Sequence, residues 1–164
     1  CRFPRLCIYY AWALQFEYQL EAAESALACA GAHLDTTALA TVPLSTETSP
    51  SAAFSAGQIA HHARAVRVYM AVQRGKPDLV IELARAALEA LPENAADEPP
   101  VVRGAVTLGL GMGHFQLGQT EAAYRALQSA LPLNQRDGNR YAALRVRKNI
   151  TSGTHQVGCG VDRG

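Results

Sequence analysis

The sequence predicts an all-α protein, and three observations support this fold class. The 164 residues are 49% apolar and 18% charged, which is the balance of a globular chain and not of a disordered one. Alanine and leucine carry most of the apolar content, and these residues favour helix over sheet. A fourteen-residue pattern also occurs three times without a gap, at 18–31, 75–88 and 118–131. We therefore expect one domain, over residues 1–150, assembled from repeated helices.

The three copies of the pattern share the residue types of a packed helix. Columns six, ten and thirteen are spaced by four and then three residues, so they lie on one face of a helix. These columns hold mostly small residues, which let a second helix lie close, and the fourth column is always acidic, which suits the first turn of a helix. The acidic residues are Glu21, Asp78 and Glu121. The residues expected to pack between helices are Leu27, Ala30, Val80, Leu83, Ala87, Ala123, Leu127 and Ala130.

The first helical hairpin is expected at about 5–33. Residues 6–16 form an almost wholly apolar run, which is typical of a helix buried on most sides, and Pro4 suits the first turn of that helix. The first copy of the repeat, at about 20–33, is its partner helix. Residues 35–54 are rich in Thr, Ser and Pro and lack a helical period, so we predict a long loop there.

Two further hairpins are expected, at about 55–91 and 100–132. In the second hairpin, Gly75 ends the first helix and Asp78 caps the repeat helix that follows. In the third hairpin, Pro132 is expected to stop the repeat helix because proline lacks the backbone N–H that a helix interior needs.

After the third hairpin the pattern allows one more helix, at about 139–150, whose partner is missing. Residues 151–164 contain four glycines and no helical period, so we expect a disordered or non-native tail. The chain begins at Cys1 without an initiator methionine, so we also expect it to be a piece of a longer protein. The predicted fold is thus three hairpins plus one extra helix.

Composition also limits the function. With 15 basic and 14 acidic residues, the formal net charge of +1 is not the electrostatic footprint of a protein that binds nucleic acid or an anionic membrane. No apolar run approaches the roughly twenty residues that cross a bilayer. The four cysteines form neither a CxxC pair nor a disulfide framework, which suggests a reducing, cytoplasmic setting. They are Cys1, Cys7, Cys29 and Cys159.

The arrangement resembles the tetratricopeptide repeat (TPR), in which a helix that ends in glycine is followed by a short turn and a second helix with small residues in fixed columns. Gly75 and Gly118 match the turn glycine of that family, whereas Tyr18 departs from it. The order of segments, from PRLCIYYAWAL through VVRGAVTLGLGMGHFQLGQTEAAYRAL to RDGNRYAAL, is similar to the MalT-like TPR region of LuxR-family ATP-dependent transcriptional regulators. The resemblance covers about residues 4–146 and implies a TPR-like superhelix of antiparallel hairpins.

That resemblance implies a function without catalysis. A regulator of this family would carry an ATPase module ahead of this segment and a helix-turn-helix DNA-binding module after it. ATP is therefore expected only in the upstream module, and no cofactor is expected in this segment. The segment would bind an effector or a partner protein, and this binding would bias self-association and so transcription. The alternative is a free-standing TPR adaptor that binds a peptide of another protein and has no link to DNA.

Partner binding is expected on the first helix of each hairpin, because these helices usually line the concave side of a helical superhelix. A mixture of aromatic, amide and basic side chains suits a peptide or a small polar effector. Trp12 and Phe115 could equally be core residues. Aligned on the turn positions, the expected groove residues are Arg5, Trp12, Gln15, His62, Tyr69, Gln73, Met112, Phe115 and Gln116.

Other patterns are weaker. The run GLGMG at 109–113 has His114 where a Rossmann fingerprint needs its third glycine, so we interpret it as close helix packing. His61 and His62 point about 100° apart on a helix, so we expect surface or groove histidines and no metal site. No catalytic triad or carboxylate pair stands at a meaningful spacing, so we expect no enzyme. A basic cluster is better explained as a solvated helix face than as a phosphate site; it comprises Arg140, Arg145, Arg147 and Lys148.

Overall fold

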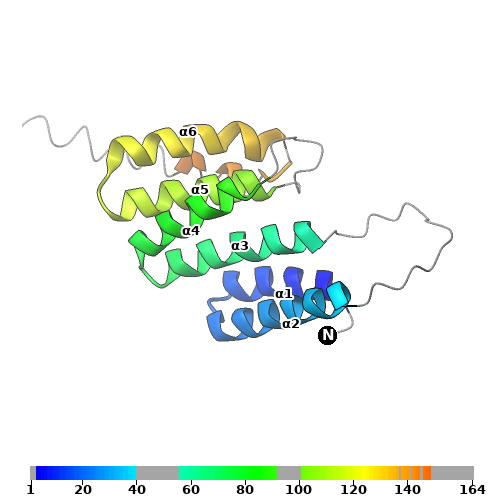
Figure 1. Cartoon of the computed structure of the whole chain (residues 1–164). Helices are drawn as coiled ribbons and strands as arrows, with labels where there is room; N and C mark the ends of the chain where they lie inside the picture. Colours follow the sequence, from blue (N-terminus) through cyan, green and yellow to red (C-terminus); the bar gives the residue numbers. More distant parts are fainter. Residues whose placement is uncertain are drawn as a thin grey trace, which may run out of the picture. The chain divides into compact units, whose positions relative to one another are not determined.

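A computed structural model describes residues 3–39, 56–91, 101–136, 138–140, 142–144 and 146–148. Within these ranges the regular elements are all helices, which confirms the all-α prediction (Figure 1). In chain order they are α1 (Pro4–Phe16), α2 (Leu20–Leu39), α3 (Ala56–Gln73), α4 (Pro77–Glu89), α5 (Val102–Gln116) and α6 (Thr120–Arg136). The described residues between 140 and 148 are helical as well, as expected for the extra helix. The tail predicted at 151–164 lies outside the described residues.

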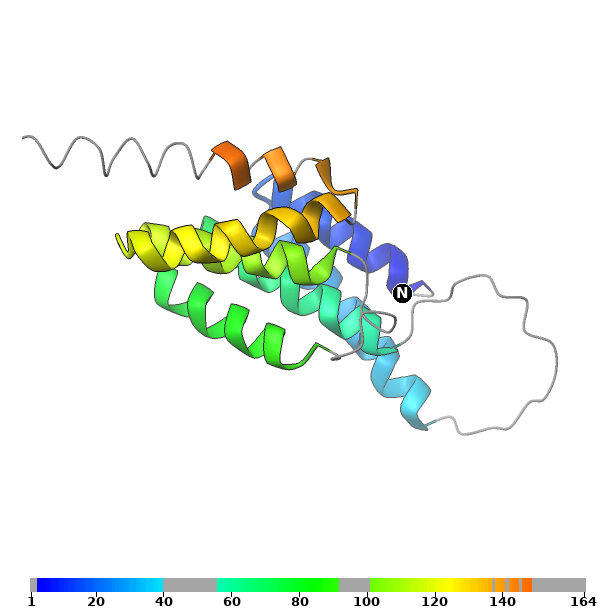
Figure 2. The same cartoon turned by 90° about the horizontal axis from the view of Figure 1, so that it is seen from above.

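The chain divides into two compact units, which we call unit 1 (Cys1–Val66) and unit 2 (Arg67–Gly164). Unit 1 contains the hairpin α1–α2 and the first part of α3. Unit 2 contains the rest of α3, then α4, the hairpin α5–α6 and the helical residues after it. Within unit 2, α5 packs against both α4 and α6, and Figure 2 shows α6 running alongside α5.

Three predicted boundaries were wrong. The α2 helix continues to Leu39, so residues 35–39 are helical and not part of a loop, and residues 40–55 lie outside the described part of the chain. Threonines weaken a helix only slightly, so they did not end α2. The α6 helix continues through Pro132 to Arg136, and Asn134, two residues beyond the proline, is fully buried. Finally, α4 begins at Pro77 and not with Asp78 as its cap.

The start of α4 follows from proline chemistry. The N-cap residue is Lys76, whose side chain makes no capping hydrogen bond, and Pro77 occupies the first helical turn. The fixed φ of proline suits that position, and its missing N–H costs nothing there. Asp78 therefore lies inside the first turn, where its carboxylate faces the positive end of the helix dipole.

One turn geometry recurs four times along the chain. The backbone φ is positive at Tyr18 (59°), Gly75 (62°), Gly118 (70°) and Gly138 (70°). At Gly118, its N–H donates to the carbonyl of Phe115 at 3.0 Å, and the next N–H donates to His114 at 2.9 Å. The same pair of hydrogen bonds closes the other three turns, and it is the Schellman motif that ends many helices. The turn columns identified in the sequence are therefore structurally equivalent, Tyr18 included.

The core of unit 1 includes the seam between α1 and α2. On α2 the buried positions are mainly alanines, which bring the two helices close. Cys7 is disulfide-bonded and Cys29 is a free thiol, whereas the cysteine spacing had not indicated any disulfide. The buried residues of α1 are Cys7, Ile8, Ala11, Leu14 and Gln15, and those of α2 include Ala23, Ala26, Leu27 and Ala30.

The centre of unit 2 is α5, which is buried on several sides. A Cβ atom at Gly109 would lie 2.5 Å from Val68 of α3, and one at Gly113 would lie 2.8 Å from Val80 of α4. On the side of α6, a Cβ at Gly111 would lie 2.9 Å from Leu127. The glycine-rich run is thus a helix that other helices approach closely, as the sequence predicted. Of the residues expected to pack between helices, all are buried except the half-buried Leu83.

Candidate functional site

The nine predicted groove residues differ in accessibility. Exposed side chains are Arg5, Phe115 and Gln116; half-buried ones are Trp12, Gln73 and Met112; buried ones are Gln15, His62 and Tyr69. The prediction that the last three are open to a partner was wrong. Gln15 shares its face of α1 with the core residue Ala11, and Tyr69 shares its face of α3 with Val72, so both are part of the packing. His62 is only 8% exposed.

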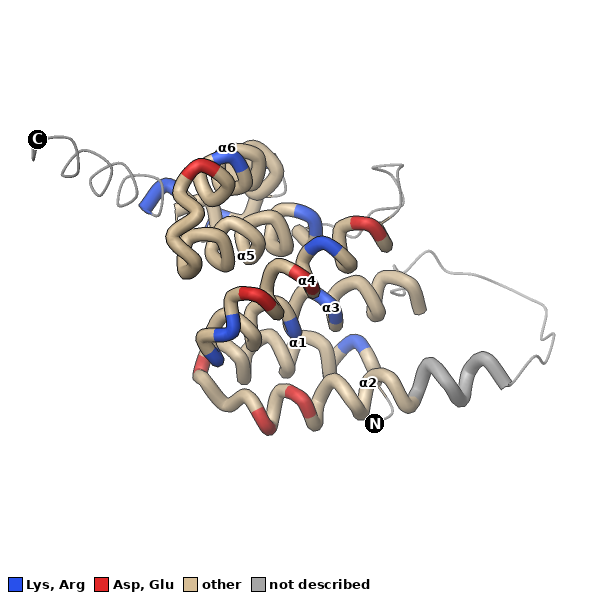
Figure 3. The backbone as a smooth tube through the Cα atoms, turned by 60° about the vertical axis from the view of Figure 1, so that its left-hand side comes forward, with Lys and Arg blue, Asp and Glu red and all other residues tan. Residues whose placement is uncertain are grey.

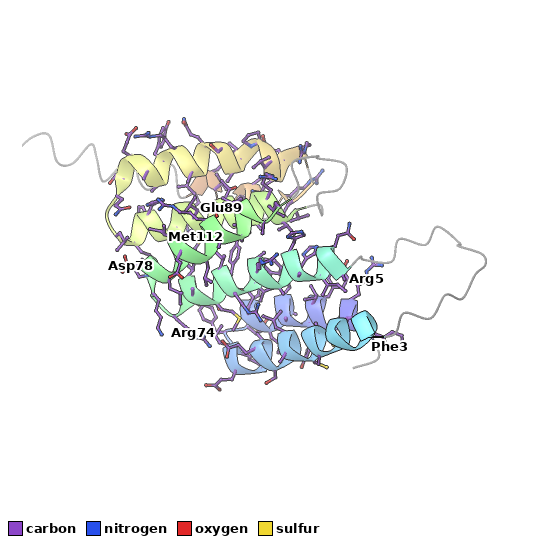
Figure 4. The ribbon with its side chains drawn as sticks, viewed as in Figure 1. Phe3, Arg5, Arg74, Asp78, Glu89 and Met112 are labelled. Carbon is purple, nitrogen blue, oxygen red and sulfur yellow. The ribbon has the colours of Figure 1, made fainter. Side chains whose placement is uncertain are left out.

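In unit 1, the accessible candidates belong to an aromatic surface on α1. The Arg5 guanidinium lies 5.7 Å from the centre of the Tyr9 ring, a distance at which a cation is attracted to the ring face. In the last turn of α1, the rings of Trp12 and Phe16 are stacked, with their centres 6.1 Å apart and an angle of 26° between their planes. Figure 4 shows Phe3 and Arg5 at the N-terminal end of α1. These contacts order the rings along one helix.

In unit 2, the accessible candidates gather near the C-terminal ends of two helices. The Gln116 Nε2 donates a hydrogen bond to the Val72 carbonyl at 3.2 Å, which ties the end of α5 to the end of α3. Phe115 precedes Gln116 and is 38% exposed, and Met112 lies one turn earlier (Figure 4). We call Gln73, Met112, Phe115 and Gln116 the α5 patch. It offers a ring, a thioether and two amides, which are groups that bind peptides.

Two buried polar side chains of the α5–α6 hairpin escaped the sequence interpretation. The His114 Nδ1 lies 2.6 Å from the Gln119 Oε1, and this bond spans the turn between α5 and α6. Asn134 donates from Nδ2 to the Ala130 carbonyl at 2.8 Å, and its amide lies against Gly104 of α5. The signal for the first pair was a histidine and a glutamine on either side of a turn glycine. Both groups hold α5 and α6 in register.

The two neighbouring histidines of α3, His61 and His62, belong to unit 1 and differ in burial. Burial of the imidazole, and secondarily the neighbouring His61, lower the pKa of His62 to about 4. His62 is therefore neutral at physiological pH. His61 is half-buried, and its Nδ1 lies 3.4 Å from the Arg64 guanidinium. Over the described residues there is no group of three or more metal-ligating side chains.

Charges are spread over the helices without large separation of sign. Figure 3 shows Lys and Arg interspersed with Asp and Glu along the drawn helices. The ion pair of Arg125 and Glu121, at 3.1 Å, is exposed and so contributes little to stability. From the basic cluster, Arg140, Arg147 and Lys148 are exposed, whereas Arg145 is outside the described side chains. None of the described helices has the length and apolar character needed to cross a membrane.

The geometry assembles contact surfaces: an aromatic face on α1 and the α5 patch at the ends of α3 and α5. Both consist of side chains suited to binding by burial and hydrogen bonding. A comparison of the chain with protein-family models, with curated proteins and with solved structures found no significant match in any of the three.

Proposed function

We propose that this chain is a helical-repeat segment that binds an effector or a partner protein, within a transcriptional regulator of the LuxR and MalT-like kind, and that it has no catalytic activity of its own. In this proposal the segment acts in the cytoplasm and needs no cofactor, and ATP binds only to a separate upstream module. DNA is contacted by a separate downstream module, not by this segment.

The observation that carries the proposal is the repeated unit of helix, Schellman turn and helix. Tyr18 and Gly118 stand in equivalent turns, one hundred residues apart, and the helices that follow them share the same acidic and small-residue columns. Each repeated hairpin has a seam of small residues between its two helices, and other side chains of its first helix remain available for further contacts. Proteins built from such units bind extended partners along their surface, which supports a binding role.

Within this proposal the α5 patch is the contact site for a peptide. Its Phe115 ring is accessible, while the backbone beneath it is held by the bond from Gln116 to Val72. A ring presented from a rigid helix loses little conformational entropy on binding. The exposed Gln116 keeps its Oε1 for a backbone N–H of an extended peptide, and this hydrogen bond would give orientation without requiring charge.

The first test concerns the reading frame that encodes the chain. The proposal expects a GxxxxGK[ST] loop upstream and a helix-turn-helix module downstream. If the complete reading frame encodes neither module, the regulator proposal is excluded and the free-standing TPR adaptor is the remaining function. A frame with both, whose product neither binds DNA nor changes transcription of any promoter, would also contradict the proposal.

The second test places a photo-crosslinking amino acid at Phe115 in the complete protein inside its own cells. We expect a discrete protein or peptide adduct at this position. The matched control is Tyr124 on α6, which has the same 38% exposure and also carries an aromatic ring. An adduct that forms equally at both positions would mean that the α5 patch is not a specific site.

A further inference from the structure

The surface of α1 that faces away from its seam with α2 is apolar. Its exposed members are Phe3 (62%), Leu6 (61%), Tyr9 (47%), Tyr10 (61%) and Phe16 (44%), and Ala13 lies among them. We call these six residues the outer face of α1. On a helix they recur at intervals of three and four residues, so they form one continuous stripe. Scattered apolar side chains on a surface are ordinary, but a contiguous stripe marks an interaction site.

The repeat register shows what this surface does in an equivalent helix. Because the turns at Tyr18 and Gly118 are equivalent, Leu6 corresponds to Val106, Tyr9 to Gly109 and Ala13 to Gly113. All three α5 residues are buried, whereas all three α1 residues are exposed. The same columns are therefore an interface in one hairpin and a solvent-exposed surface in the other.

The contacts of α5 identify the element that covers these columns. A Cβ at Gly109 would lie 2.5 Å from Val68 of α3, and a Cβ at Gly113 would lie within 3.3 Å of Val80 and Ile81 of α4. These contacts all come from the hairpin that precedes α5 in the chain. Its facing side chains are β-branched aliphatic residues. The outer face of α1 is thus equivalent to a surface that receives a preceding helical hairpin.

Two physical arguments decide which occupant fits. The terminal helix of a repeat array needs a polar outer surface, and the outer face of α1 is aromatic and aliphatic, which is typical of an internal repeat. The face is also small: a helix of 13 residues is about 20 Å long and, at a diameter of about 10 Å, offers about 200 Å². A stable interface between separate proteins buries about 800 Å² on each partner. A covalently joined hairpin needs much less, because its effective concentration is high.

We propose that the outer face of α1 packs against a helical hairpin of the α3–α4 kind, carried ahead of α1 on the same polypeptide and presenting β-branched aliphatic side chains. Large side chains at Leu6, Tyr9 and Tyr10 replace Val106, Gly109 and Leu110 of α5, so this hairpin lies farther from α1 than α3 and α4 lie from α5. This inference does not depend on the effector or on any link to DNA.

The test compares the 164-residue chain with the product of its complete reading frame. In both, Tyr10→Cys is labelled with a maleimide, and the labelled peptide is identified by mass spectrometry so that the native cysteines do not interfere. We expect labelling of this cysteine to be slower by about tenfold or more in the complete product, because local opening must precede the reaction. Tyr124→Cys on α6 is the matched control and should react at the same rate in both proteins.

A photo-crosslinker at Leu6 in the complete product then identifies the covering segment. Adducts to residues ahead of α1 are expected, and adducts to a second copy or to another protein would overturn the proposal. Equal, fast labelling at residue 10 in both proteins would also overturn it, as would a reading frame with no hairpin ahead of α1. Protection in the 164-residue chain that rises with its concentration would assign the face to self-association instead.

Discussion

The hairpins α1–α2 and α5–α6 share one register, with equivalent residues one hundred apart, but their first helices meet opposite surroundings. Their seams match: Leu27 and Leu127 are both nearly inaccessible, and so are Ala30 and Ala130. Their outer columns do not match, since α5 is surrounded by α3, α4 and α6 whereas α1 exposes large aromatic side chains. The comparison teaches that the seam is fixed by the hairpin itself, while the outer columns are fixed by the neighbouring hairpin.

If the seam is common to both hairpins, its leucines should be equally important. We expect Leu27→Ala and Leu127→Ala each to lower the free energy of unfolding of its own unit by about 3 kcal/mol, from lost burial and the cavity left behind. Denaturant melts followed by hydrogen exchange of peptides from each unit measure the two losses separately. Costs that differ by more than about twofold would break the equivalence of the two seams.

Acid should lower the stability of unit 1 through His62, which has no counterpart in the α5–α6 hairpin. Burial keeps the pKa of His62 near 4 in the folded chain, against 6.5 when unfolded. The unfolded chain thus binds a proton first, so the free energy of unfolding falls from pH 6.5 to pH 4, by about 3 kcal/mol in total, and then levels off. Trp12 is the only tryptophan, so its fluorescence during urea unfolding reports on unit 1. The His62→Gln variant should lose this part of the pH dependence, and an unchanged profile would exclude His62 as its source.

The outer columns should respond in opposite ways to added volume. We expect Gly113→Leu to destabilise unit 2 by about 2 kcal/mol or more, because Val80 and Ile81 already occupy the space of its Cβ. The equivalent Ala13→Leu adds volume to an exposed position and should change stability by less than about 0.5 kcal/mol. Urea midpoints of the two variants in the 164-residue chain decide this, and equal losses would refute the difference between the two outer faces.

The smallest expected effect concerns the one turn that lacks glycine. Tyr18 holds a φ of 59°, which is costly for a residue with a Cβ atom, so Tyr18→Gly should stabilise unit 1 by about 0.5 to 1 kcal/mol. The reverse change, Gly118→Ala, should destabilise unit 2 by about 1 kcal/mol. Thermal melts of both variants test the pair, and a loss of stability in Tyr18→Gly would show that the tyrosine side chain contributes more than its backbone strain costs.

The sequence alone was enough for the fold class and the turn columns, because periodic small residues and turn glycines depend on local spacing. Gly75 and Gly118 marked turns in this way, and even Tyr18 could be placed by alignment. The ends of α2 and α6 could not be predicted from local residue types: α6 continues beyond Pro132, where Asn134 is buried against Gly104 of α5. Such contacts join residues that are distant in sequence.

The candidate site was predicted less well, for a related reason. Column position placed Gln15, His62 and Tyr69 in a groove, but burial depends on which helix lies over each column. The hydrogen bond from Gln116 to Val72 likewise joins two helices and leaves no local pattern in the sequence. Residue type and helical period therefore gave Phe115 and Tyr69 the same predicted place in the groove, although Phe115 is accessible and Tyr69 is buried.

The glycines of α5 also affect the order in which unit 2 can fold. Four of them lie inside this helix, and each lowers its intrinsic helical stability by about 0.5 to 1 kcal/mol relative to alanine. The neighbouring α4 and α6 contain no glycine, so they can nucleate first, and we expect α5 to become helical only once both can pack against it. Val106→Ala should then speed unfolding and leave the refolding rate nearly unchanged, whereas a slowed refolding rate would place α5 in the folding nucleus. Until α5 docks, the apolar faces of α4 and α6 stay open to water, and this interval is when unit 2 is most exposed to aggregation.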